Sequence, residues 1–171
     1  MRNGLAALVV DAWQDMDRVL ARLSPQDLVR QVDGSSAAWT LAHVTQQVDS
    51  WINMRFQQLA PHPLIRQDQF RMGGTGAADD CPAIERAVRD VRALALPYLT
   101  SLEEVADPVI PYDGSLMWIR DKGLGLRFAL ARISTHHYLH IGEIAAKRNQ
   151  LGVTGDLTAD LAAGAGLIAE Q

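Results

Sequence analysis

Cysteine is nearly absent from this sequence, which has Cys81 alone in 171 residues. One cysteine cannot form an internal disulfide, and it excludes zinc modules built from several cysteines. Long apolar runs are missing too: no stretch approaches the roughly 20 residues that a membrane-spanning helix needs. The first residues become charged too early to resemble a secretory signal. These absences predict a cytoplasmic protein with no membrane partner.

The sequence also lacks an excess of positive charge. Lys and Arg number 16 against 20 Asp and Glu, which gives a formal charge of −4, and the positive residues are scattered. We therefore expect no nucleic acid partner. The hydrophobic content of 48% is enough for one substantial core, and the chain is too short for two independent domains. Residues 1–171 are predicted to form a single domain.

Apolar residues recur every three or four positions in several stretches, which is the pattern of amphipathic helices. The predicted helices run over residues 5–23, from about 37 to before 61, from about 80 to 100, and over 126–150, with a short Ala-rich helix at about 158–170. Ser35 or Ser36 is expected to cap the second helix and Asp80 the third. The connections 61–80 and 103–125 hold several Pro and Gly residues, so both should be irregular, the latter packing over the helices. This organisation predicts an all-α fold, a four-helix bundle with long connections.

Histidines carry the strongest functional signal. His136 and His140 are four residues apart, so they share one face of their helix, about one turn from each other. That face also carries Ile133 and Ile144 and should point into the bundle. His43 lies on the second predicted helix, and metal sites in bundles draw their ligands from facing helices. We predict that His43, His136 and His140 bind one metal ion and leave open positions, as catalytic sites do.

Two neighbours of the histidine pair leave alternatives open. His137 is about 100° around the helix from His136, so we expect it not to bind the metal, although a pair of His137 and His140 is the geometric competitor. Glu143 follows His140 by three residues and lies close to the same face. It is our candidate catalytic residue, with three possible roles: a fourth ligand, an acceptor for an imidazole N–H, or a base for metal-bound water.

Two segments resemble a known family. Residues 39–43, Trp-Thr-Leu-Ala-His, and residues 136–144, His-His-Tyr-Leu-His-Ile-Gly-Glu-Ile, are similar to motifs of the DinB/YfiT-like metalloenzymes. In that family the second helix carries Trp-x-x-x-His, and a later helix carries His-x-x-x-His followed by Arg or Ile, then Gly, then Gln or Glu. The resemblance spans about residues 5–151. It implies a four-helix bundle in which His43, His136 and His140 hold a divalent metal, which is zinc, nickel or iron in different members.

The same resemblance implies a range of activities on small-molecule substrates. Relatives include thiol S-transferases that use bacillithiol or mycothiol, and a mycothiol-dependent maleylpyruvate isomerase. The implied function is a metal-dependent transferase that activates a low-molecular-weight thiol cosubstrate. One alternative is a hydrolase in which Glu143 activates metal-bound water. Another is a noncatalytic metal-binding or dimerisation bundle.

A homodimer is the predicted assembly. The apolar faces of the helices, which include Trp13 and Trp51, exceed what the core of one chain is expected to need. Packing of such faces between two copies through the bundle helices would remove them from water.

Overall fold

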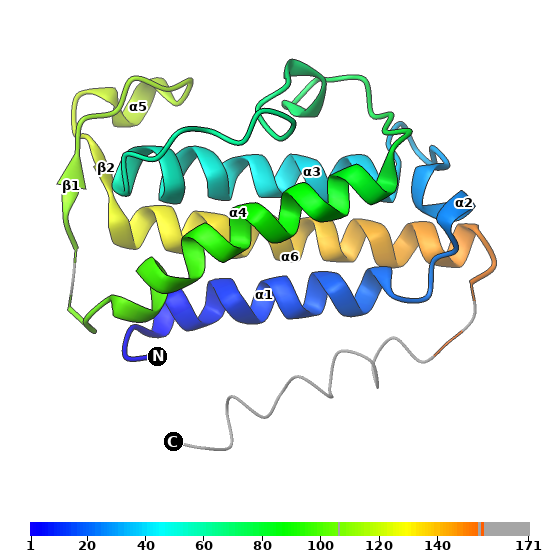
Figure 1. The fold of residues 1–171 in the computed structure, drawn as a ribbon, viewed down its shortest axis with the longest axis horizontal. Coiled ribbons are helices and arrows are strands. Elements are labelled where there is room, and N and C mark those ends of the chain that lie inside the picture. The colour runs from blue at the N-terminus through cyan, green and yellow to red at the C-terminus, as the bar shows by residue number, and fades with distance from the viewer. Residues whose placement is uncertain (106, 154, 156–171) are drawn as a thin grey trace.

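A computed structural model describes residues 1–105, 107–153 and 155, and four long helices dominate this part of the chain. They are α1 (Gly4–Leu20), α3 (Ala37–Val48), α4 (Cys81–Ser101) and α6 (Leu126–Gln150). Figure 1 shows α1, α6 and α3 side by side, with α4 crossing them on one face. The predicted all-α four-helix bundle is therefore confirmed. The Ala-rich helix expected at about 158–170 lies outside the described residues.

Side-chain caps mark where three of these helices, α1, α3 and α4, begin. The Asn3 side chain accepts hydrogen bonds from the first backbone N–H groups of α1, Ser36 accepts one from Trp39, and Asp80 accepts one from Ala83. Such caps satisfy N–H groups that have no partner within the helix. Of the two serines expected at the start of the second helix, Ser36 is the cap.

The second helix does not end with α3. It continues as a π-helix, η1 (Asp49–Phe56), so the helical segment reaches nearly to Pro61 as predicted, but with a wider hydrogen-bond pattern. Between the first two predicted helices lies a short helix that the sequence did not predict, α2 (Pro25–Val29). Ser24 caps α2, and Pro25 occupies its first turn, where its missing N–H costs nothing.

The two connections contain little regular structure, as predicted. The first has a single 3₁₀ turn, η2 (Asp68–Phe70), and the second has α5 (Met117–Arg120) between the antiparallel strands β1 (Val109–Ile110) and β2 (Leu124–Gly125). The second connection covers the bundle only in part. Its Ile119 and Leu124 are buried, whereas Met117 and Trp118 are more than 60% exposed.

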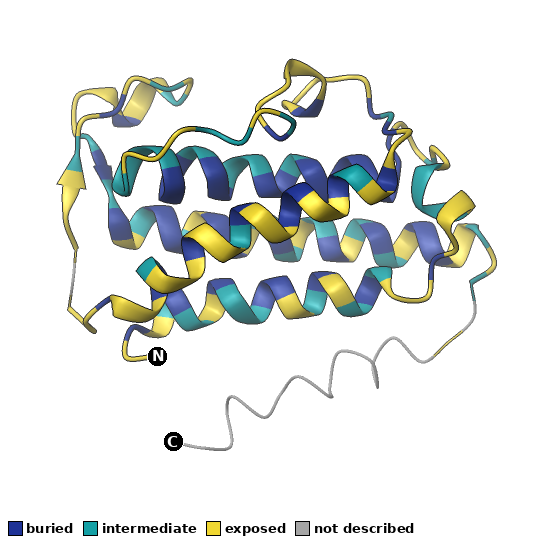
Figure 2. Cartoon of the chain, viewed as in Figure 1, coloured by how far each residue is buried: buried dark blue, intermediate teal, exposed yellow. Residues whose placement is uncertain are grey.

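Buried side chains lie mainly on the inward sides of the helices and form one hydrophobic core (Figure 2). Trp13 and Trp51 are each 5% exposed and belong to this core. A single chain thus buries both tryptophans, so they are not available to a dimer interface. The homodimer stays a prediction. Within the described residues, no helix is both long and apolar enough to cross a membrane.

Candidate metal site

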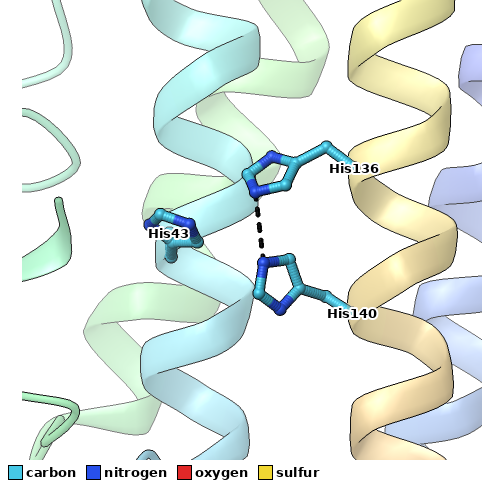
Figure 3. A group of neighbouring side chains, drawn as sticks. All are labelled: His43, His136 and His140. Carbon is cyan, nitrogen blue, oxygen red and sulfur yellow. Dashed lines mark hydrogen bonds between the residues drawn. The ribbon is translucent and has the colours of Figure 1, made fainter. Parts of the chain in front are cut away.

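Three imidazoles from two helices meet between α3 and α6. His43 projects from α3, and His136 and His140 project from α6 toward it (Figure 3). One ring nitrogen from each lies within 4.8 Å of the others. The centroid of the His43 ring is 5.0 Å from that of His136 and 5.2 Å from that of His140. The structure therefore brings together the three histidines that the sequence singled out.

Hydrogen bonds fix which nitrogen of each ring faces its neighbours. The Nδ1–H of His43 donates to the carbonyl oxygen of Phe70 at 2.7 Å, and that of His140 donates to Oε2 of Glu143 at 2.7 Å. Nδ1 of His136 donates to Oε1 of Gln47 at 3.0 Å. Because these oxygens can only accept, the lone pair available on each ring is at Nε2. Acceptors of this kind orient metal-binding histidines in proteins.

The spacing of the two α6 nitrogens fits a divalent metal, and the nitrogen of His43 lies within 4.8 Å of both. Nε2 of His136 and Nε2 of His140 are 3.1 Å apart. Two nitrogens each about 2.0–2.1 Å from one ion, at tetrahedral or octahedral angles, would be about 2.8–3.4 Å apart. A set of imidazole nitrogens suits zinc, nickel or iron. The residues present therefore fit the metal that the three-histidine pattern implies.

Burial keeps the rings in the form that binds metal. It lowers the pKa of His136 to about 3, with the neighbouring His140 and His43 adding to the effect. Burial also lowers the pKa of His43, against the opposing hydrogen bond to Phe70. These two imidazoles are neutral at pH 7, and only a neutral imidazole offers a lone pair to a cation.

The connection between α3 and α4 supplies part of the site. Its backbone carbonyl at Phe70 accepts the His43 N–H, and its carbonyl at Gln69 accepts the indole N–H of Trp39 at 2.6 Å. The Trp39 ring stacks on His43 with centroids 4.8 Å apart, because residues four apart share a helix face. The sequence contained the Trp39 and His43 spacing, but it gave no sign that this irregular connection would contribute two acceptors.

Glu143 accepts hydrogen bonds from three donors: an imidazole, an ammonium and a hydroxyl. Its Oε2 accepts from His140, and its Oε1 accepts from Nζ of Lys147 at 2.6 Å and from Oγ of Ser35 at 3.0 Å. Burial raises the pKa of Glu143, but the hydrogen bonds from Lys147 and His140 outweigh it and bring the pKa to about 2. Of the three roles open to Glu143, these contacts favour the acceptor of an imidazole N–H. Ser35 and Lys147 were not expected at the site.

His137 lies apart from this group. It is 1% exposed, and its Nδ1–H donates to the carbonyl oxygen of Ile133 at 2.9 Å. Burial lowers its pKa to about 4. Of the two adjacent rings, the structure thus brings His136 to His43 and His140. His62 is elsewhere in the connection, with its ring 3.7 Å from Asp90.

Polar residues that follow His43 on its helix have separate partners. Gln47 reaches His136, whereas the Gln46 amide donates to the carbonyl oxygen of Ile65 and Ser50 accepts from Arg55. Of these three, only Gln47 contacts a histidine of the group.

Similarity to known proteins is found at the level of a family. No match was found among curated proteins or among solved structures. A family model described as the DinB superfamily matches residues 8–144, which include α3, α4 and the histidine pair of α6. The chain therefore belongs to the DinB superfamily.

Proposed function

We propose that this protein is a metal-dependent transferase that joins a low-molecular-weight thiol to an electrophilic small molecule. The observation that supports it most is the convergence of three imidazoles whose Nδ1–H groups are all engaged, which leaves three Nε2 lone pairs for one ion. A bound divalent metal supplies Lewis acidity, which holds a thiol as its thiolate at neutral pH.

The chain's own residues have distinct tasks in this proposal. His43, His136 and His140 hold the ion, while the Phe70 carbonyl and the side chains of Gln47 and Glu143 fix the orientation of the rings. Three nitrogen ligands leave at least one position for a cosubstrate.

The nucleophile has to come from a cosubstrate, because the one protein thiol is unsuited to the task. Cys81 lies buried at the start of α4, 3.7 Å from Oε1 of Glu85. Burial, together with the negative charge of Glu85, raises its pKa to about 11. The thiolate is the reactive form of cysteine, and little of it exists here at neutral pH.

Hydrolysis by metal-bound water is the weaker alternative. Glu143 would have to act as the base, yet both of its oxygens accept hydrogen bonds and its pKa is about 2. A general base is most effective when its pKa is near the working pH. The contacts of Glu143 therefore support an orienting role over a basic one.

Purification without chelators or an affinity tag, followed by elemental analysis and a substrate panel, tests the proposal. We expect about one divalent ion per chain and turnover of an activated electrophile only when a thiol is added. His43→Ala should reduce that turnover to background. Ester or amide hydrolysis without thiol would favour the hydrolase. Absence of any turnover, with loss of the helical circular dichroism signal on metal removal, would favour a noncatalytic metal-stabilised bundle.

A further inference from the structure

A buried lysine contacts Glu143, the carboxylate that accepts the N–H of His140. Lys147, on α6 one turn after Glu143, has a side chain only 3% exposed. Its ammonium contacts three acceptors: Oε1 of Glu143 at 2.6 Å, the backbone oxygen of Ser35 at 2.9 Å, and Oγ of Ser35. An ammonium has three N–H donors, so this buried charge is fully hydrogen-bonded. Such a charge is costly to bury, so its placement calls for an explanation beyond packing.

Lys147 is connected to one of the ligand histidines. Glu143 joins the two, because Oε1 accepts from Lys147 while Oε2 accepts from His140. The Glu143 side chain is 35% exposed, so it would turn to water easily if the ammonium did not hold it. His140 would then lose the acceptor that keeps its proton on Nδ1 and its Nε2 toward the other rings.

Lys147 is also connected to the helix that carries His43, because it contacts the residue just before the cap of α3. Ser35 precedes Ser36, the residue that caps α3, and His43 lies two turns further along that helix. Lys147 donates hydrogen bonds to the carbonyl and the hydroxyl of Ser35, and these bonds link α6 to the segment that leads into α3. One ammonium thus contacts Glu143 on α6 and the residue just before the cap of α3, and α6 and α3 are the two helices from which the ligands project.

We propose that Lys147 is a positioning residue of the metal site, which holds Glu143 against His140 and α3 against α6 so that the three imidazoles are oriented before metal binds. This inference rests on the proposed metal function. It differs from a purely structural role, because loss of the ammonium would release Glu143, which is 35% exposed, from its place beside His140. Removal of one partner of a buried ion pair also lowers stability. The orientation of the rings is therefore measured in addition to folding.

The test compares Lys147→Met with Lys122→Met, which changes the other lysine of the sequence, an exposed one. Two quantities are measured on the full chain: the imidazole tautomers of the metal-free protein by ¹⁵N NMR, and the Kd for Zn²⁺ by competition with a chelating dye. For Lys147→Met we expect a mixture of His140 tautomers and a Kd about 10- to 100-fold higher, the range seen when such outer partners are lost. Lys122→Met should match the wild type.

Ser35→Ala provides a second variant, which decides the question if Lys147→Met does not fold. It removes the hydroxyl shared by Lys147 and Glu143 but keeps both charges, and the Kd should rise about fivefold, as for one lost hydrogen bond. Folded variants with the wild-type tautomer and a Kd within about twofold of the wild type would overturn the inference. If the wild-type chain does not bind Zn²⁺, the proposed function fails, while the tautomers of the metal-free variants still decide the role of Lys147.

Discussion

The three ligand imidazoles are oriented by three different acceptors: a backbone carbonyl at Phe70, an amide at Gln47 and a carboxylate at Glu143. A carboxylate polarises an imidazole more strongly than a neutral acceptor does, because the hydrogen bond is charge-assisted. Lys147 moderates this effect, since it shares the same carboxylate. His140 and His136 therefore face the metal position with unequal electron density.

The role of Gln47 is directly testable. Gln47→Leu removes the acceptor for His136 Nδ1–H, so the ring gains freedom to rotate, and we expect the Kd for Zn²⁺ to rise about tenfold. Isothermal titration of the folded variant measures the change. Gln57→Leu is the matched control, because Gln57 bonds to Asn53 and to the Leu94 carbonyl instead. Equal affinities in the two variants would show that Gln47 does not orient the ring.

Cys81 should be an unreactive thiol. A rise of its pKa from 9.0 to about 11 lowers the thiolate fraction at pH 8 by about a hundredfold, because the protonated form is favoured at any pH below the pKa. We expect iodoacetamide to modify the folded protein far more slowly than the protein in denaturant. Mass spectrometry follows the reaction. Equal rates in the two states would contradict the buried, protonated thiol.

At the scale of elements, local signals in the sequence predicted the main helices but not the contacts between them. Ser36 and Asp80 are recognisable caps, and the four-residue spacing of His136 and His140 fixes their shared face. Lys147 and Ser35 are 112 positions apart, so their pairing depends on how α6 packs against α3. The contact of the Phe70 carbonyl with His43 could not be predicted either. Every residue has a carbonyl, and only the conformation of this loop directs that of Phe70 toward His43.

The helical pattern of apolar residues also did not decide which of the adjacent rings, His136 or His137, belongs to the metal site. His137 continues the apolar row of Leu130 and Ile133, and the structure buries it there with its proton on the Ile133 carbonyl. His136 lies at the edge of that row and reaches α3. The choice between the two rings needed the position of the neighbouring helix.

The cap of α3 should contribute measurably to stability. Ser36→Ala removes the buried hydroxyl that accepts from the Trp39 N–H, and we expect a loss of about 1 kcal/mol in the free energy of unfolding. Urea denaturation followed by circular dichroism gives the value. Ser24→Ala, at the exposed cap of the short α2, should cost less. A larger loss from Ser24→Ala than from Ser36→Ala would contradict this account of α3.

For the molecule as a whole, the core is formed by buried side chains of a single chain. A homodimer would therefore have to bury apolar side chains that are exposed in one chain. Leu139 on α6 is 66% exposed, and Leu94 on α4 is 47% exposed. We expect light scattering at micromolar concentration to give twice the 18.7 kDa of one chain. Leu139→Asp should shift the mass toward the monomer. A wild-type monomer would rule out the predicted homodimer.

We expect His43, His136 and His140 together to bind one divalent metal, and the metal content per chain decides whether they do. Elemental analysis should give about one ion for the wild type and for His62→Ala and His137→Ala, whose rings lie outside the group. His43→Ala, His136→Ala and His140→Ala, each folded by circular dichroism, should fall well below one. Normal metal loading in these three variants would contradict the site.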